Sequence, residues 1–433
     1  MSSDSNKRPD YSMDSFLVHG AMRDEHWDYA SHVIPPITAS TAFRLASTER
    51  GAAGFATFAS PEHTGPGKSP IYIYERLAEP TVALLEHQFA ELEGTKSATA
   101  FASGMAAISG VMLAVCKAGD DIVAHKTIYG CTYSLFTTWL PRFGMPVQFG
   151  DFRDVESIRS LIKPTTRVLY FETPANPTLD IIDVQAVAAL AKEINASRPK
   201  AEALYVVVDN TFATPYCQRP ATLGADVVVH SLTKNCMGFG TDMAGLAAHP
   251  LELHSAIRMV RKDFGGAVAS RAAWNIHVYG ISTLAIRMQR QNKSALEVAK
   301  YLEAHPQVKK VFYPGLESHA GHEVAKRQMC GFDGEFAPGL MVYFELAGEP
   351  AVAYEGAKRF MDHVANNSYC LTLAVSLGNT KTLIEAPALM THSAYDPESA
   401  AKAGMSVAGI RLSIGLENPQ DIIRDLESGF GAM

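Results

Sequence analysis

The stretch Ala-Asp-Val-Val-Val-His-Ser-Leu-Thr-Lys at positions 225–234 constrains the fold of this chain more than any other. It begins as a short apolar run, which predicts a strand buried on both faces within a parallel sheet. It ends in the hydroxyls of Ser231 and Thr233 and then in Lys234. Burial disfavours the ammonium form of a lysine, and this favours chemistry in which the lysine forms a Schiff base. Taken alone, the stretch is equally compatible with a Lys234 side chain that points to solvent.

The composition is that of an ordinary globular protein. A chain of 433 residues is too long for one compact core, so we expect two domains with appended segments. A net charge of −7 without long charged runs argues against a surface for nucleic acid or anionic membranes. No apolar run approaches the ~20 residues of a membrane-spanning helix, and the polar residues 1–10 lack the apolar segment of a signal peptide.

Six cysteines are scattered along the chain without a Cys-x-x-Cys pair, at positions 116, 131, 217, 236, 330 and 370. In a chain of this size the pattern predicts free thiols in a reducing cytoplasm. We expect no disulfide framework and no zinc site, and we assign no metal ligands.

Short β-like segments alternate with helical ones through the first two thirds of the chain. A helix is predicted from Pro80, with Gly94 as its stop, and another over 183–195. The candidate strands are 121–125, 167–172, 204–209, 225–231 and 244–248. This alternation predicts a mostly parallel sheet covered by helices on both sides.

The two ends of the chain differ from this pattern. Residues 51–70 are rich in Gly, Ala, Ser and Pro and predict a surface loop or arm. After about residue 269, the pattern predicts a long helix, three strands and a closing helix, at 285–305, 308–313, 340–346, 410–416 and 421–430. Together these elements predict a smaller α+β domain.

Three features near the predicted sheet are suited to ligand chemistry. Asp209 closes an apolar strand, where an acid meets a positive group on a ligand lying across the sheet; a cap in a turn or helix is the commoner role. Ser103-Gly104-Met105 precedes an apolar helix, whose first N–H groups favour phosphate. Tyr129 either stacks on a flat cofactor and donates a proton or packs in the core. No glycine fingerprint for nucleotides is present, which disfavours a dinucleotide-binding oxidoreductase.

Five motifs follow one another in the order found in one known family. They are Ser103-Gly-Met, Tyr129-Gly, Glu172-Thr-Pro-Ala-Asn-Pro177, Asp209-Asn-Thr and Ser231-x-Thr-Lys234. From about residue 14 to the C-terminus, the chain resembles the pyridoxal-phosphate (PLP) enzymes of Cys/Met metabolism, the trans-sulfuration enzymes. The resemblance implies the α/β fold of fold-type I, aspartate aminotransferase-like PLP enzymes. Such a fold has a mostly parallel seven-stranded sheet and a smaller C-terminal α+β domain.

The resemblance also implies how the cofactor is held. Lys234 would carry PLP covalently, Asp209 would pair with its pyridine nitrogen, and Tyr129 would stack on its ring. The phosphate and the 3-oxygen would be bound by Gly104, Met105, Ser231, Thr233 and Asn176.

Further roles implied by the resemblance concern the substrate and a second subunit. Arg411 matches the arginine that grips the substrate carboxylate, for which a bidentate guanidinium is suited, and Ser376 belongs to the same substrate site. Tyr74 and Arg76 match residues that the neighbouring subunit contributes, so the active site would be shared within a homotetramer, a dimer of dimers. We accordingly expect an N-terminal arm that contacts the neighbouring subunit, a PLP-binding domain and a C-terminal domain, over 1–78, 79–285 and 286–433.

Three positions resemble the methionine γ-lyases within this family. They are Cys131, Lys262 with the following aspartate, and Val375. The cystathionine enzymes usually carry glutamate at the position of Val375, whereas valine suits an apolar thioether tail. Departures from the family pattern are Phe239 and Thr241 after the lysine, glutamates at 75 and 79, and the long segment 51–70.

The expected reaction is γ-elimination of L-methionine, or of related sulfur amino acids such as homocysteine, to a thiol, ammonia and 2-oxobutanoate. Lys234 would act as base at Cα and move protons to and from Cβ, while Tyr129 would protonate the departing thiolate. Cystathionine γ-synthase, cystathionine γ-lyase and O-acetylhomoserine sulfhydrylase share every cofactor residue, so these activities stay open as alternatives. A catalytically silent protein is disfavoured because Lys234, Asp209 and Arg411 are all present.

Overall fold

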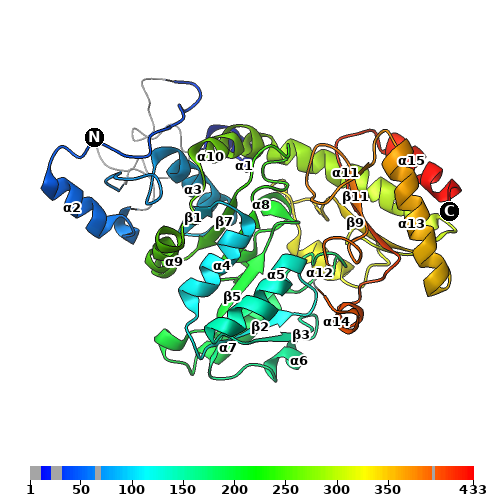
Figure 1. Cartoon of the computed structure of the whole chain (residues 1–433), viewed down its shortest axis with the longest axis horizontal. Helices are drawn as coiled ribbons and strands as arrows, with labels where there is room; N and C mark the ends of the chain where they lie inside the picture. Colours follow the sequence, from blue (N-terminus) through cyan, green and yellow to red (C-terminus); the bar gives the residue numbers. More distant parts are fainter. Residues whose placement is uncertain (1–10, 21–31, 64–69, 393–394) are drawn as a thin grey trace.

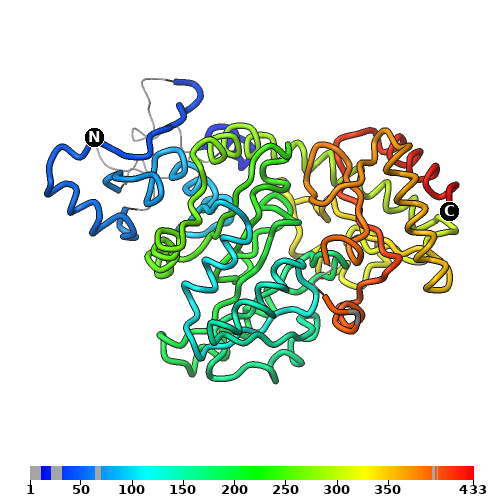
Figure 2. The backbone as a smooth tube through the Cα atoms, in the orientation of Figure 1, coloured from blue at the N-terminus to red at the C-terminus, as the bar shows by residue number. Residues whose placement is uncertain are grey.

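Two β-sheets, one large and one small, organise the chain (Figure 1). The computed structural model describes residues 11–20, 32–63, 70–392 and 395–433. The sequence-based expectations for residues 1–10 and 64–69 lie outside these described residues. The tube in Figure 2 places the blue segment at residues 48–57 and the red C-terminal helix at opposite ends of the long axis.

The large sheet has seven strands in the order β1-β7-β6-β5-β4-β2-β3. β7 pairs antiparallel with both of its neighbours, and the other pairs are parallel. The strands are β1 (Ser97–Phe101), β2 (Asp121–His125), β3 (Val147–Gly150), β4 (Thr166–Glu172), β5 (Tyr205–Asp209), β6 (Val227–Ser231) and β7 (Gly245–His249). The predicted mostly parallel, seven-stranded sheet is confirmed, although the sequence pattern does not predict β1 and β3.

Helices cover both faces of the large sheet, as the strand–helix alternation predicts. On one face, α4 (Gly104–Val115) and α9 (Leu251–Phe264) share a buried cluster with Val207 and Val229. On the other face, α7 (Val184–Asn195) packs in a cluster with Val206 and Val208. Successive side chains of a strand point to opposite faces. A strand between two helical layers is therefore apolar along its length, which explains the valine runs of β5 and β6.

The small sheet has five strands in the order β10-β11-β12-β9-β8. They are β8 (Val308–Phe312), β9 (Met341–Leu346), β10 (Thr372–Leu373), β11 (Leu383–Glu385) and β12 (Gly409–Ser413). The long helix α11 (Leu284–Ala304) precedes this sheet, and α13 (Pro350–Asn367) and α15 (Pro419–Gly431) share a buried cluster with β9. The predicted smaller C-terminal domain is confirmed. The expected boundary at 285/286 falls at the start of α11, and the exact division into domains remains a prediction.

A helix, α2 (Thr48–Thr57), occupies part of the segment 51–70, so the prediction of a surface loop is wrong for residues 51–57. The Oγ of Ser47 caps this helix and accepts a hydrogen bond from the Arg50 N–H at 3.1 Å. Gly54 faces Ile73 so closely that a Cβ would lie 2.6 Å from the Ile73 Cδ1. The glycines that indicate a loop in the sequence therefore serve close packing of a helix.

The remaining helices are short and connect the larger elements. They are α1 (Met13–His19), α5 (Gly130–Ser134), α6 (Val155–Arg159), α8 (Thr214–Cys217), α10 (Ser270–Asn275), α12 (His322–Gln328) and α14 (Pro397–Lys402). No helix within the described ranges is long and apolar enough to cross a membrane.

Glu79 begins α3 (Pro80–Glu93), the helix that the sequence predicts to end at Gly94. Its carboxyl oxygens accept hydrogen bonds from the backbone N–H groups of Thr81 and Val82, at 2.8 and 2.6 Å. The residue is 1% exposed, and burial raises the pKa of the Glu79 carboxyl to about 7. This glutamate, one of the departures from the family motif, is thus a buried helix cap.

The raised pKa of Glu79 predicts a pH-dependent stability. The folded protein binds a proton here more tightly than the unfolded chain, so this contribution is fully present below about pH 4.5 and is lost as the pH rises through 7. In Glu79→Asn the cap retains an acceptor that does not titrate. We expect wild type to lose up to about 3 kcal/mol relative to this variant between pH 4.5 and 8. Unfolding midpoints measured across this range check it, and parallel profiles would contradict it.

Candidate active site

A cavity of about 610 Å³ opens where β4, β5 and β6 end. This volume lies in the range of about 300–1,000 Å³ that is usual for small-molecule pockets. Most of the predicted site residues line it: Gly104, Met105, Tyr129, Cys131, Asn176, Asp209, Ser231, Thr233, Lys234, Val375, Ser376 and Arg411. They come from both sheets, because Arg411 belongs to β12. The site therefore lies between the two parts of the chain.

Lys234 follows β6 and points into this cavity, so the solvent-facing alternative is excluded. Its Nζ donates a hydrogen bond to Ser376 Oγ at 2.7 Å. Burial lowers the pKa of the Lys234 ammonium, the neighbouring Arg411 lowers it further, and Glu385 opposes them. A lysine that gives up its proton more readily is suited to covalent chemistry with a carbonyl group. Ser376 itself adopts φ +101°, a conformation that residues other than glycine rarely adopt.

Two acids lie side by side at the ends of neighbouring strands. Glu172 of β4 and Asp209 of β5 are paired in the sheet register. Burial raises the pKa of the Asp209 carboxyl, whereas its hydrogen bond from the Thr211 N–H, at 2.9 Å, favours the ionised form. Burial and then Asp209 raise the pKa of the Glu172 carboxyl well above its usual value. A cation bound beside Asp209 would stabilise its ionised form. Asp209 therefore serves as a turn cap and also faces the cavity.

The start of α4 forms one wall of the cavity. Ser103 caps the helix, with its Oγ accepting a hydrogen bond from the Ala106 N–H at 3.1 Å. Gly104 approaches β6 so closely that a Cβ would lie 2.8 Å from the Ser231 Cβ. The backbone N–H groups at the beginning of this helix favour an anion. Thr233, whose hydroxyl accepts a hydrogen bond from the Ala244 N–H, lines the same side.

Tyr129 also lines the cavity, at the start of α5. Its backbone N–H donates to Glu172 Oε1 at 2.8 Å, and its hydroxyl lies 3.3 Å from the Cys131 Sγ. Burial raises the pKa of the Tyr129 phenol, so its hydroxyl is protonated at neutral pH. The next residue, Gly130, touches the C-terminal part of the chain, and only glycine fits there. A Cβ added at this position would lie 2.2 Å from the Thr391 carbonyl oxygen.

Arg411 spans the two parts of the chain. Its guanidinium donates to Asn176 Oδ1 at 2.8 Å and to the Ser376 carbonyl at 2.9 Å, and it pairs with Glu385 at 2.9 Å. Arg411 is 2% exposed, and its Nε has no hydrogen-bond partner within the described part of the chain. Such a buried, positively charged group with an unused donor suits a carboxylate.

Tyr74 and Arg76 are the predicted site residues that do not line this cavity. The Arg76 guanidinium lies 5.7 Å from the centre of the Tyr74 ring and donates to the Lys262 carbonyl. Tyr74 is 44% exposed. Neither Phe239 nor Thr241 lines the cavity, whereas Met243 from the same loop does.

Sequence reasoning missed several residues of the site. Glu172 belongs to a quoted motif, yet only Asn176 of that motif received a role. Glu385 has no local motif, because its importance comes from the ion pair with Arg411 on the neighbouring strand. Thr211 follows Asp209 by two residues, a spacing typical of a side-chain-capped turn.

Comparison with known proteins decides the family. The model of the "Cys/Met metabolism PLP-dependent enzyme" family matches residues 14–431. This chain belongs to that family. An L-methionine γ-lyase of Fusobacterium nucleatum subsp. polymorphum is 44% identical over 395 residues, covering 91% of this chain and 92% of the relative. An L-methionine γ-lyase of Porphyromonas gingivalis is 40% identical over 399 residues, covering 92% of each.

A solved structure supports the fold assignment. The crystal structure of cystathionine γ-lyase from Lactobacillus plantarum complexed with L-serine has a TM-score of 0.83 and 34% identity. The likeness covers 98% of this chain and 99% of that chain. The predicted family, the fold-type I architecture and the PLP dependence are therefore confirmed. The donor set also fits PLP, since the cavity combines a buried lysine, an acid, a helix start and two hydroxyls.

The contact of Gly104 with Ser231 predicts how PLP binding responds to a methyl group. In Gly104→Ala the new Cβ would lie 2.8 Å from the Ser231 Cβ and 3.0 Å from its Cα, so α4 must move away from β6. We expect the Kd for PLP to rise by about tenfold or more, measured by titrating apoprotein and following absorbance. Gly266→Ala is the control, because its Cβ meets Phe101 at an ordinary 3.4 Å. Equal affinities in the two variants would contradict the role of this contact.

Proposed function

We propose that this protein is a carbon–sulfur lyase that converts L-methionine, and related amino acids such as homocysteine, to a thiol, ammonia and 2-oxobutanoate. The observation that carries the proposal is the set of apolar side chains that line the cavity, among them Ile108, Met243, Val375 and Met390. Apolar side chains of this kind accommodate a thioether. The similarity to methionine γ-lyases across nine tenths of the chain supports the same substrate.

Within this proposal, PLP is held by the residues named from the sequence. When bound, it supplies an electron sink that stabilises negative charge at the neighbouring carbon. Lys234 would carry it covalently, Asp209 would pair with its pyridine nitrogen and Tyr129 would stack on its ring. Its phosphate and 3-oxygen would be bound by Gly104, Met105, Ser231, Thr233 and Asn176.

The substrate is oriented and its protons are moved by side chains of the same cavity. Arg411 binds the α-carboxylate, and Ser376, whose carbonyl receives a hydrogen bond from Arg411, belongs to the same subsite. Lys234 removes the Cα proton as a free amine and carries protons to and from Cβ. Tyr129 donates its hydroxyl proton to the departing sulfur, and the raised pKa of its phenol keeps that proton in place until then. Cys131 lies beside that hydroxyl.

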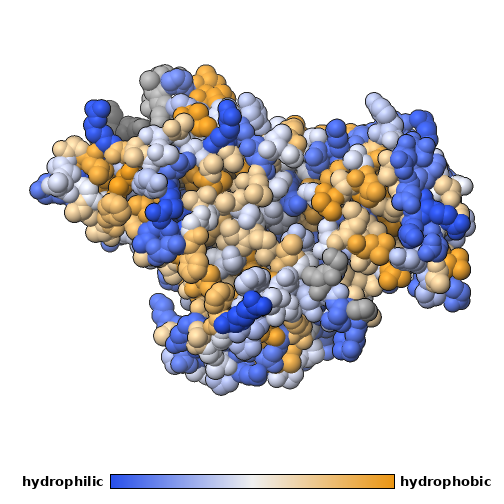
Figure 3. Space-filling view, viewed as in Figure 1, coloured by the Kyte–Doolittle hydropathy of each residue, from blue (hydrophilic) through white to orange (hydrophobic). Residues whose placement is uncertain are grey.

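The active site is shared between subunits of a homotetramer in this proposal. Tyr74 and Arg76 lie outside the cavity of their own chain and would complete that of a neighbour. Large apolar side chains of the same N-terminal arm are exposed: Val33 (87%), Phe55 (59%) and Ile34 (49%). Figure 3 shows apolar surface on this N-terminal arm, at the left of the view. The six cysteines, all free, support a cytoplasmic location.

The alternative activity is cleavage or synthesis of cystathionine, or sulfhydrylation of a homoserine ester. The likeness to a cystathionine γ-lyase structure favours keeping it as a second candidate. Cystathionine carries a second ammonium and a second carboxylate, for which the apolar side chains that line the cavity offer no partner.

The first test follows 2-oxobutanoate release from L-methionine together with the visible spectrum. A yellow protein that forms 2-oxobutanoate is expected, and Lys234→Ala should lose turnover because it removes both the covalent anchor and the base. A yellow wild type that is idle on methionine would move the assignment to the cystathionine and homoserine substrates. Turnover retained in Lys234→Ala would refute the role of that lysine.

Arg411 allows a test of substrate binding. Arg411→Lys retains a positive charge opposite Glu385 but loses the planar donor set. A lost charge-assisted hydrogen bond is worth about 1.5–3 kcal/mol, so KM for methionine should rise by about 10- to 100-fold, with a smaller change in kcat. Steady-state kinetics on protein that retains the PLP absorbance check this, and an unchanged KM would count against carboxylate binding at this position.

A further inference from the structure

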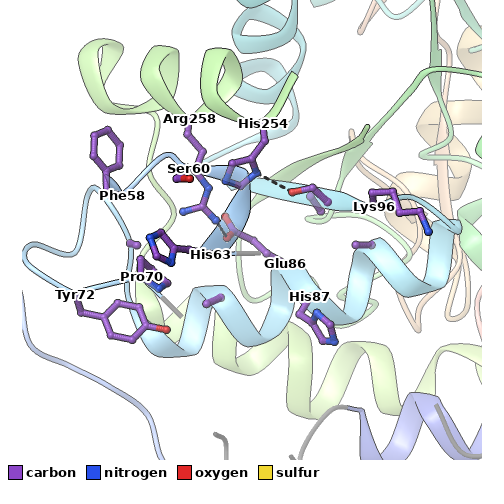
Figure 4. A pocket seen from close by; sticks show the side chains of 15 residues that line it. Phe58, Ser60, His63, Pro70, Tyr72, Glu86, His87, Lys96, His254 and Arg258 are labelled. Carbon is purple, nitrogen blue, oxygen red and sulfur yellow. Dashed lines mark hydrogen bonds and ion pairs between the residues drawn. The ribbon is translucent and has the colours of Figure 1, made fainter. Parts of the chain in front are cut away.

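A buried ionic cluster lies away from the cavity, between α3 and α9. Glu86 of α3 pairs with Arg258 and Arg261 of α9, and all three are at most 7% exposed. Figure 4 shows Arg258 and Glu86 facing each other beside His254. Burial acts to raise the pKa of the Glu86 carboxyl, but the two guanidiniums hold it below its usual value. The cluster therefore contains one acid and two cations.

The two arginines differ in what else they hold. Arg258 donates to Glu86 and, within the described part of the chain, to no other residue. Arg261 donates to Glu86 Oε1 at 2.6 Å, to the Ala100 carbonyl at 3.0 Å and to the Leu77 carbonyl at 2.7 Å. Arg261 therefore joins three segments that lie 161 to 184 positions before it in the sequence.

The two carbonyls bound by Arg261 belong to segments that carry candidate cofactor residues. Leu77 closes the turn after Tyr74 and Arg76, with its N–H donating to the Tyr74 carbonyl at 2.9 Å. Ala100 lies in β1, four residues before Gly104, and its N–H donates to Glu86 at 2.9 Å. One guanidinium thus contacts the backbone of both segments.

The chemistry of arginine suits this position. Its guanidinium is always charged and presents donors in a rigid, planar arrangement, so it fixes several acceptors in one geometry. A buried carbonyl that loses its donor is left unsatisfied, which costs free energy unless the backbone moves. Loss of Arg261 would release both segments together.

We propose that Arg261 is a positioning residue that holds the Tyr74–Arg76 turn and the strand leading to Gly104 in a fixed relation. It thereby supports PLP binding in its own cavity through β1 and in the neighbouring subunit's cavity through Tyr74 and Arg76. The second half rests on the proposed shared active site. Arg261 touches neither cofactor nor substrate and acts through these two backbone segments.

Arg258→Met and Arg261→Met form a matched pair for the test. Each removes one guanidinium from Glu86, so the change in buried charge is the same. Only Arg261→Met also releases the Leu77 and Ala100 carbonyls. In the holoenzyme, hydrogen exchange should be at least fivefold faster over 74–79 and 97–104 in Arg261→Met than in Arg258→Met. The Kd for PLP, from titration of the full-length apoprotein, should rise about tenfold in the first and less than twofold in the second.

The outcomes separate this proposal from the assignment of methionine as substrate. Neither readout uses methionine, so a protein idle on methionine would leave both interpretable. Equal exchange and equal PLP affinity in the two variants would overturn the proposal, and faster exchange without weaker PLP binding would overturn the coupling to the cofactor. If Arg261→Met fails to fold, Arg261→Lys is compared with Arg258→Lys, with the same order of effects expected.

Discussion

The burial of β4, β5 and β6 between two helical layers is the constraint on which the rest of the structure depends. It requires strands that are apolar throughout, so polar side chains are confined to the ends. Glu172 and Asp209 close two of these strands, and Lys234 follows the third. The layered architecture therefore gathers acids, hydroxyls and a lysine at one edge of the sheet, where partial burial changes their acidity.

The small sheet completes this edge by bringing one cation to it. Arg411 enters from β12 and binds Asn176 on one side and Ser376 on the other. Glu385 keeps the guanidinium paired, while its Nε stays without a partner among the described residues. Because Arg411 lies beside Lys234, it also favours the neutral form of the lysine. One arginine would therefore link the proposed binding of the substrate carboxylate with the acidity of the proposed base.

Features that depend on neighbouring residues in the sequence could be predicted, whereas features that depend on contacts between distant parts of the chain could not. Local patterns and family motifs predict three features that agree with the structure. These are the strand ending at Asp209, the helix ending before Gly94 and the position of Lys234 in the cavity. Helix α2 was missed because its glycines serve packing against Ile73, a contact across the fold. Glu385 was missed for a similar reason, since its partner lies 26 positions away on another strand.

The departures at 75 and 79 show how a family motif can change without a change in chemistry. Glu79 takes over the capping of α3, a role that an asparagine also performs. Glu75 accepts a hydrogen bond from the Ser270 hydroxyl at 2.8 Å, which ties the same turn to the start of α10. Both glutamates thus hold the segment that presents Tyr74 and Arg76, and Arg261 holds it from the other end through Leu77. Three separate contacts therefore fix a segment that lies outside the cavity of its own chain, as the proposed contribution to a neighbouring cavity would require.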